Sequence, residues 1–531
     1  MKKLFLIITI LLGTASAIIS GESFKYRIWL TDKAGNDFST EHPEDFLSQK
    51  SISRRNRQNI PIEENDLPVC KHYIETITAL GGTPVVSSRW LNTVVIALDD
   101  TSVLSAIRTL PFVEKTECVW KENKTYSILS RKKRADTRDS ISYEKEDYRT
   151  NYAQIALNGI DSLHRQGYHG EGITIAVLDA GFYNVNNEPT IDTTHIAGTW
   201  NFPHQTFSYE GDEHGAMVLS CMLSNDPQYY IGSAPQAHYW LIVTEDIDSE
   251  YPVEEDYWVA GAELADSVGA DIINTSLGYN YFDDTSMNYS WSDLDGTTSF
   301  CSRGATIAAS KGMLVVAAAG NEGSNQWKKI TVPGDAPDIL TVGAVNPDRT
   351  RTYFSSIGFT ADGRIKPDIM ATGRGACMVL EGDVIAAQGT SFATPIICGG
   401  LACLWQARPE WSVSELIEAV QRSSSRADTP DEYCGYGIPD LYKALNYRSN
   451  TPAIQHNPLT ITYTSYGELN LSQPATQQTA ISIYDTTGQE VYSSVIQEGN
   501  TYVEYTPAAG IYFILLNNGQ KQHVQKIRIA Q

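Results

Sequence analysis

Hydrophobic and polar positions follow different periods in different parts of the chain, and these periods predict its secondary structure. In the central region, apolar runs at 172–178, 271–273 and 313–319 each end in a polar residue or a glycine. Continuous apolar runs are typical of parallel strands that are buried on both faces. The longer apolar segment at 396–405 suits a buried helix. The pattern predicts a central α/β domain with a mostly parallel sheet.

The first part of the chain shows a mixed pattern. Residues 24–30 alternate like a strand, 91–98 read as a central strand, and 112–120 return as a strand. Helical spacing at 69–80 ends at a Gly-Gly pair, and a second helical pattern at 102–110 is stopped by a proline. We expect a small α+β domain here.

The last part of the chain is rich in strands and turns. A polar break without periodicity covers about 448–458, and strand patterns follow at 481–488, 510–519 and 525–529. About seventy residues of strands and turns suggest a small β-sandwich.

Composition narrows the class of protein. The 531 residues carry a formal net charge of -23 and are 42% hydrophobic, which indicates a globular chain and argues against nucleic-acid binding. Residues 1–17 combine a basic start, an apolar run and a small-residue end, as a secretory signal does. No later stretch reaches the length of a membrane-spanning helix. The eight cysteines permit disulfides in an exported chain without assigning their pairs.

The stretch GTSFATP at 389–395 is the first candidate for chemistry. Ser391 lies where a loop enters the predicted helix, and Pro395 fits the first turn of that helix. A hydroxyl at the positive end of a helix dipole suits a nucleophile whose attack produces an oxyanion. The alternative is an N-cap serine, which helices use routinely.

Two further positions supply candidate partners for this serine. Asp179 closes the apolar run at 172–178, and open α/β sheets place their sites at the carboxyl ends of strands. The alternative for Asp179 is an ordinary aspartate in a turn. His214 is followed directly by a glycine and an apolar helical run, whereas His195 belongs to the segment HIAGT.

These segments, in this order, resemble the motifs of the subtilisin family of serine peptidases. The order Asp179, His214, Ser391 is the order of triad residues in that family. HIAGT fits less well as the base motif, because the family has its catalytic histidine three residues before the corresponding histidine, and Asp192 stands there. We therefore assign the base to His214 and expect His195 to be a structural or surface residue.

The resemblance implies a fold, a reaction and a role for each residue. It implies a doubly wound sheet of the subtilisin type and a serine endopeptidase that acts through an acyl-enzyme. Ser391 would attack, His214 would move the proton, and Asp179 would orient His214. Asn321, in the segment GNEG, and the Ser391 N–H would hold the oxyanion.

The chain departs from the family pattern at several positions of these motifs. The substitutions, as they stand in this sequence, are Ala180 for Thr or Ser, Ala216 and Met217 for a threonine and a histidine, and Phe392 for Met. The resemblance also implies substrate-binding residues, which are Ser276, Leu277, Gly278, Ala318, Gly320 and Thr331. Thr331 lies two residues before Pro333-Gly334 and would form the floor of the main specificity pocket. Its β-branched side chain would shorten that pocket and disfavour large aromatic residues.

The resemblance extends to the outer parts of the chain. The N-terminal α+β part resembles a subtilase propeptide, so we expect a zymogen, and the basic run at 131–134 lies where such a propeptide would be cut. The C-terminal part, with IYDTTGQEV and AAGIYFILL, resembles the sorting domain of type IX secretion and would engage outer-membrane secretion machinery. The expected parts are a signal peptide at 1–17, a propeptide at 18–121, a linker at 122–147, a peptidase domain at 148–447, a linker at 448–456 and a sorting sandwich at 457–531.

Catalysis by these residues requires no cofactor, and no residue is assigned to a metal. An insert at 279–298 is rich in carboxylates, which are Asp283, Asp284, Asp293 and Asp295. Their pattern allows a structural calcium site or a solvated loop. Two other functions stay open: a catalytically silent surface protein that uses a peptidase scaffold for binding protein partners, and an esterase or transferase. We expect the protein to be secreted or held at the cell surface, to act on proteins or peptides, and to have no transmembrane segment after maturation.

Overall fold

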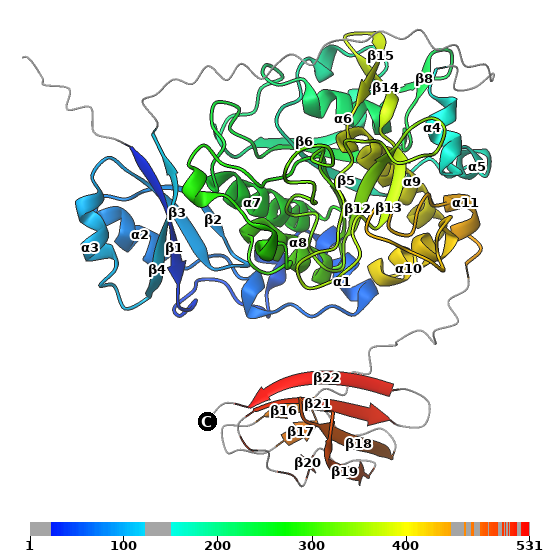
Figure 1. The fold of residues 1–531 in the computed structure, drawn as a ribbon. Helices are drawn as coiled ribbons and strands as arrows, with labels where there is room; N and C mark the ends of the chain where they lie inside the picture. The colour runs from blue at the N-terminus through cyan, green and yellow to red at the C-terminus, as the bar shows by residue number, and fades with distance from the viewer. Residues whose placement is uncertain are drawn as a thin grey trace, which may run out of the picture. The chain divides into compact units, whose positions relative to one another are not determined.

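The computed structural model describes residues 23–122 and 150–447, and the strands between 461 and 529 with short gaps between them. The chain divides into two compact units, Met1–Tyr447 and Arg448–Gln531. The predicted signal segment and the two predicted linkers lie outside the described residues, apart from Glu122. Figure 1 shows the elements of both units.

A seven-stranded parallel sheet forms the centre of the larger unit. Its order is β13-β12-β11-β10-β5-β9-β6. The strands are β5 Thr174–Asp179, β6 Ile196–Asn201, β9 His238–Val243, β10 Ile272–Thr275, β11 Leu314–Ala318, β12 Leu340–Val345 and β13 Ile369–Thr372. The order reverses between β5 and β10, and open sheets have a crevice at the carboxyl ends of strands at such a point. The predicted doubly wound sheet is confirmed.

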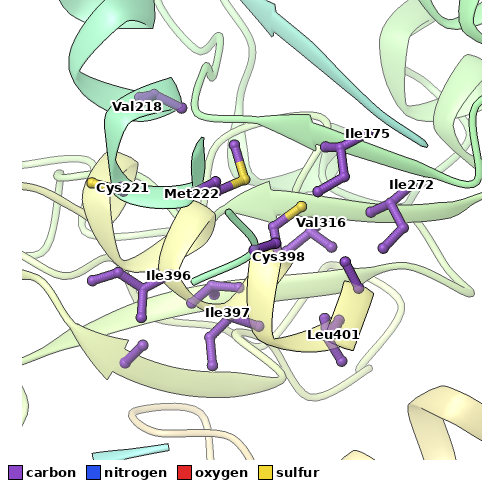
Figure 2. Close-up of a cluster of buried hydrophobic side chains, with 14 of the residues drawn as sticks. Ile175, Val218, Cys221, Met222, Ile272, Val316, Ile396, Ile397, Cys398 and Leu401 are labelled. Carbon is purple, nitrogen blue, oxygen red and sulfur yellow. The ribbon is translucent and has the colours of Figure 1, made fainter. Parts of the chain in front are cut away.

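Helices cover both faces of this sheet. The helices α6 His214–Leu223 and α9 Thr390–Ala407 pack on one face, and α7 Val253–Val268 and α8 Phe300–Ser310 pack on the other. Figure 2 shows the first layer, in which side chains of α6 and α9 meet those of three central strands. The labelled residues are Ile175, Val218, Cys221, Met222, Ile272, Val316, Ile396, Ile397, Cys398 and Leu401. This two-sided burial explains why the strand sequences lack polar alternation.

Shorter elements complete the central domain. The helices are α4 Tyr152–Leu157, α5 Ile160–Arg165, α10 Val413–Ser423 and α11 Leu441–Ala444, and a hairpin is formed by β14 Arg374–Leu380 and β15 Asp383–Gln388. A two-stranded ribbon, β7 Asn225–Asp226 and β8 Tyr230–Ile231, follows α6. No helix in the described ranges is long and apolar enough to cross a membrane. None of the eight cysteines, all of which the structure describes, forms a disulfide.

The N-terminal domain, residues 23–122, is an antiparallel sheet in the order β2-β3-β1-β4. Its elements are β1 Phe24–Leu30, α1 Gln49–Gln58, α2 Lys71–Ala79, β2 Thr83–Ser88, β3 Thr93–Leu98, α3 Leu104–Ile107 and β4 Val113–Lys121. One face packs with α2 and α3, and the other packs against α7 through Val95 and Val119. The pattern predicted this α+β architecture, but it assigned no element to α1 and none to β2.

The C-terminal unit contains two antiparallel sheets with a shared core. One has the order β16-β17-β20 and the other β19-β18-β21-β22. The strands are β16 Ile461–Tyr463, β17 Leu469–Leu471, β18 Thr479–Tyr484, β19 Glu490–Ile496, β20 Tyr502–Val503, β21 Gly510–Asn517 and β22 Gln522–Ile529. Leu469 and Val503 of the first sheet pack with Ile481 and Ile514 of the second. Such packing is that of a small sandwich.

Candidate active site

A cleft of about 780 Å³ opens at the carboxyl ends of the central strands. All six predicted substrate-binding residues line it, as do His214, Asn321 and Ser391. Asp179 lies behind this wall and is fully buried, while its neighbour Ala180 reaches the cleft. The structure thus brings residues from six separate segments of the sequence to one surface.

Asp179 and His214 form a direct pair at the wall of the cleft. The distance from His214 Nδ1 to Asp179 Oδ1 is 2.7 Å, and the Ala180 N–H donates to the same oxygen at 2.8 Å. The glycine after the histidine permits this approach, because a Cβ on Gly215 would lie 2.3 Å from the Gly181 carbonyl oxygen. The HG pair in the sequence therefore reflects the close packing of α6 on the end of β5.

Ser391 is the second residue of α9, and it is 8% exposed. The N-cap of this helix is Gly389, so the alternative of an N-cap serine is wrong. Ser391 Oγ donates to the Ser276 carbonyl oxygen at 3.2 Å. The ring centroids of Phe392 and His214 lie 5.9 Å apart. The phenylalanine that stands in place of the family's methionine therefore makes an aromatic contact with the histidine.

Pro395 corrects one expectation about this helix. It lies inside α9, beyond the first turn, where a proline removes the hydrogen bond to the carbonyl four residues earlier. That carbonyl belongs to Ser391, and the Ser276 hydroxyl donates to it at 2.8 Å instead. The proline therefore leaves an acceptor that ties Ser391 to the end of β10.

Asn321 has a defined orientation. Its Oδ1 accepts hydrogen bonds from the Thr390 N–H at 2.9 Å and from the Thr390 hydroxyl at 3.2 Å. A backbone N–H is always a donor, so it fixes which amide atom is the oxygen. The amide NH₂ of Asn321 is thereby directed away from Thr390. Asn321 lines the cleft beside Ser391, where its NH₂ group can donate a hydrogen bond to an oxyanion.

Thr331 lies between two glycines of the cleft. A Cβ on Gly278 would stand 2.1 Å from Thr331 Oγ1, and one on Gly320 would stand 2.9 Å from it. The Thr331 side chain is 3% exposed, and its hydroxyl has no hydrogen-bond partner among the described residues. A buried unpaired hydroxyl in a cleft is a place for a ligand group or a water.

Carboxyl groups in the cleft are a feature that the sequence analysis missed. Asp212, Glu213, Glu245, Glu250 and Glu322 line it, and no lysine or arginine does among the described residues. Burial, followed by the nearby Glu250, raises the pKa of Glu245, which accepts from the Tyr279 hydroxyl at 2.7 Å. The position of Glu245 just after β9, beside the end of β5, was the only signal that could have indicated it.

The other candidate residues have local structural contacts. His195 ends a short 3-10 helix, Thr193–His195, and its Nδ1 lies 3.0 Å from the Ala237 carbonyl oxygen. It does not line the cleft. In the insert at 279–298, Asp295 accepts from the Thr297 and Thr298 amides. The described residues contain no group of three or more metal-binding side chains, and a calcium site stays an untested hypothesis.

Comparison with known proteins places this fold and site in a family. A model of the subtilase family, peptidase S8, matches residues 170–437. Subtilisin NAT of Bacillus subtilis subsp. natto is 30% identical over 322 residues, which are 57% of this chain and 75% of that protein. The subtilisin of Bacillus pumilus is 30% identical over 294 residues, which are 53% and 94% of the two chains. The chain belongs to the subtilase family.

Two further family models match outside this domain. A peptidase S8 propeptide domain of Bacteroidota matches 25–139, and a secretion system C-terminal sorting domain matches 458–530. The solved prenylagaramide maturation protease PagA is 25% identical over 54% of this chain and 97% of its own, with a TM-score of 0.42. The protein is a secreted or cell-surface serine endopeptidase that is made with a propeptide. Its sorting domain implies engagement with type IX secretion machinery.

Proposed function

We propose that Ser391, His214 and Asp179 are the catalytic triad of this peptidase and that they hydrolyse peptide bonds through an acyl-enzyme. His214 takes the proton of Ser391 Oγ as the oxygen attacks the carbonyl carbon, and then gives it to the leaving amine. Water attacks the resulting ester with the same help from His214, which releases the carboxylate product. Asp179 keeps the His214 proton on Nδ1 and stabilises the imidazolium.

The tetrahedral oxyanion is held by two donors. One is the NH₂ of Asn321, which the Thr390 contacts turn away from α9. The other is the Ser391 N–H, which lies in the first turn of α9, where helix N–H groups have no acceptor in their own helix. Donors that are already in place before the charge develops lower the barrier without reorganisation.

The remaining residues of the cleft bind the substrate. Ser276, Leu277 and Gly278 follow β10 and offer an edge of backbone to the peptide. Ala318 and Gly320, at the end of β11, form the wall of the specificity pocket, and Thr331 forms its floor. The floor reduces the depth of the pocket, so small and medium aliphatic side chains are preferred before the cleaved bond.

The observation that carries the proposal is the 2.7 Å contact between His214 and Asp179 in the cleft that Ser391 lines. The decisive variant is Ser391→Ala, with Ser414→Ala on the exposed surface of α10 as the control. We expect the first variant to fold and to lose turnover on a peptide substrate by a factor on the order of 10⁶, the size of loss known for a subtilisin. The control retains full turnover.

Near-wild-type turnover of purified Ser391→Ala would contradict the triad. Absence of turnover in the wild type together with binding of a protein partner would favour the silent surface protein. Hydrolysis of small esters without cleavage of any peptide would favour the esterase.

We also propose that maturation cuts the chain within the linker at 122–147, between the N-terminal and central domains. The cut lies after β4, the last strand of the N-terminal domain.

A further inference from the structure

Carboxyl groups give the cleft a charge of one sign. Five of them line it, and no described lysine or arginine does, whereas the whole chain carries 40 basic residues beside 63 acidic ones. A surface of average composition would therefore include cations. A cleft that is lined by charges of one sign concentrates ligands of the opposite sign. The five carboxyl groups belong to Asp212, Glu213, Glu245, Glu250 and Glu322.

Glu245 is the buried member of this set. The residue is 6% exposed, yet it lines the cleft. Its Oε1 accepts hydrogen bonds from the Thr244 hydroxyl at 3.0 Å and from the Tyr279 hydroxyl at 2.7 Å, and no described residue donates to its Oε2. One oxygen thus fixes the orientation of the carboxyl group, and the other is available to a group that enters the cleft.

The surroundings of Glu245 oppose its ionised form. Burial, and after it the nearby Glu250 and Asp179, raise the pKa of Glu245 to about 8, although the two hydroxyl donors act against this shift. A positive group beside the carboxyl would lower this pKa again, because an opposite charge favours the ionised form. Buried charges in proteins are normally paired, and no described residue forms an ion pair with Glu245. A cation in the cleft would complete this site.

Glu254 of α7 is a buried carboxyl group of a different kind. Its Oε1 accepts from the Asp246 N–H at 2.8 Å and its Oε2 from the Tyr251 N–H at 3.3 Å, so both oxygens hold the loop that carries Glu250. The Glu250 N–H donates to Asp283 at 3.2 Å. These contacts fix the backbone of Glu250 before a ligand arrives, which lowers the entropic cost of binding.

The position of Glu245 relates it to one part of a bound peptide. Tyr279, whose hydroxyl holds Glu245, directly follows Gly278. Gly278 ends the backbone edge that the peptide is proposed to follow, and it adjoins the Thr331 pocket for the side chain before the cleaved bond. Glu245 therefore faces the residues that precede the one in this pocket, on the amino side of the cleaved bond.

We infer that the peptidase selects substrates with a positive group, an ammonium or a guanidinium, on the amino side of the residue in the Thr331 pocket, and that Glu245 binds this group with Glu250 beside it. The inference rests on the proposed function, because it concerns the same cleft. The positive group donates a hydrogen bond to Glu245 Oε2, and such charge-assisted bonds are about twice as strong as neutral ones. A peptide carries this chemistry in the side chains of lysine and arginine and in a free α-amino group.

The test measures kcat/KM near neutral pH for N-acetylated peptides that carry Lys or Gln at one position on the amino side of the residue in the Thr331 pocket. We expect Lys to exceed Gln by about tenfold or more at one of these positions, which is the effect of one hydrogen bond to a charged group. A second arm compares Gln peptides that begin at these positions with a free or an acetylated amino group.

The two arms distinguish the sources of the positive group. A preference for Lys identifies a side chain, and a preference for the free amino group identifies the amino terminus of the substrate. Ratios below about twofold in both arms, less than such a hydrogen bond supplies, would overturn the inference. Absence of turnover of every peptide contradicts the proposed function itself.

Glu245→Gln separates the effect of this carboxyl group from that of the charge of the whole chain. Its amide oxygen can still accept from the Tyr279 hydroxyl, and a neutral side chain suits a buried position, so we expect the variant to fold. The preference ratio should fall by about tenfold or more. Glu410→Gln, on an exposed surface, is the matched control and keeps the wild-type ratio.

An unchanged ratio in folded Glu245→Gln would overturn the inference. If that variant does not fold, Glu250→Gln takes its place, because Glu250 is only partly buried. An unchanged ratio in Glu250→Gln then overturns the inference, and a lowered ratio supports it.

Discussion

Polar residues have opposite surroundings at the two ends of the strands of the seven-stranded sheet, here called the amino edge and the carboxyl edge. At the amino edge, Asp266 accepts from three arginines, and Lys311 has several acceptors in the segment at 43–67, which we call the arm. At the carboxyl edge, Asp179 Oδ2 and Thr331 Oγ1 are buried and have no hydrogen-bond partner in the described ranges. Buried groups with many partners fix a structure, whereas buried groups without partners are expected where a substrate or a water completes the contacts. In the network at the amino ends, Arg55 Nε, Asp66 Oδ1 and Arg89 Nε also lack a partner among the described residues, but each of these side chains is held by charged contacts through its other atoms, whereas Thr331 has no side-chain partner there.

The largest expected contrast lies between two histidines. His214→Ala should lower turnover by a factor on the order of 10⁶ because it removes the proposed base, as in a subtilisin. His195→Ala should change turnover little, because its ring contacts the Ala237 carbonyl oxygen and the His238 ring, and it does not line the cleft. Both variants are compared by kcat at equal concentrations of folded protein. Loss in His195→Ala with retention in His214→Ala would reverse the assignment.

Removal of the proposed oxyanion donor Asn321 should lower kcat by less than removal of His214 does. Asn321→Ala is expected to lower kcat by about a hundred- to a thousandfold while KM changes little, because the donor acts on charge that develops in the transition state. Asn187→Ala, at the exposed end of the short 3-10 helix Val185–Asn187, is the matched control. A change confined to KM would show that Asn321 binds substrate instead.

Enlargement of the specificity pocket should change preference more than rate. In Thr331→Gly, the floor between Gly278 and Gly320 is removed. The ratio of kcat/KM for matched peptides with Phe and with Ala before the cleaved bond should rise by about tenfold or more, since one or a few methylenes in such a pocket correspond to roughly 1–3 kcal/mol. An unchanged ratio would place Thr331 outside the pocket.

The smallest effect on turnover is expected at the amino edge. Lys311→Met removes a cation from a buried network, and loss of one partner of a buried ion pair typically costs about 3–5 kcal/mol of unfolding free energy. The thermal midpoint of the full chain should fall by several degrees, while kcat on a small peptide stays within about twofold. A large loss of kcat without a change in the midpoint would refute the separation between the two edges.

The sequence allowed prediction of the cleft because its residues have local requirements. A glycine must follow His214, because a Cβ at this position would collide with the Gly181 carbonyl oxygen. Steric requirements of this kind appear in the sequence as short motifs. The strand patterns were clear because both faces of the sheet are buried. The resemblance to subtilisins then predicted that Asn321 and Thr331 belong to the cleft. The periodicity of hydrophobic residues could not have predicted this.

The arm was missed for a physical reason. The helix α1 reads QKSISRRNRQ, which has no apolar stripe, and a pattern of this kind predicts a solvated segment. Arg54 and Arg55 pair with Asp266, and Arg54 with the Lys311 carbonyl oxygen, more than 200 residues away in the sequence. Pairing over such a distance leaves no local signal in the sequence.

The most direct test of the account is covalent labelling of the mature protein with a fluorophosphonate, followed by mass spectrometry of the peptides. Reaction requires a serine that is activated by a base beside an oxyanion site, which is the property that the cleft is proposed to have. We predict one adduct, on the peptide that contains Ser391, and its loss in both Ser391→Ala and His214→Ala. An adduct on another serine, or wild-type labelling of Ser391 in His214→Ala, would contradict the account.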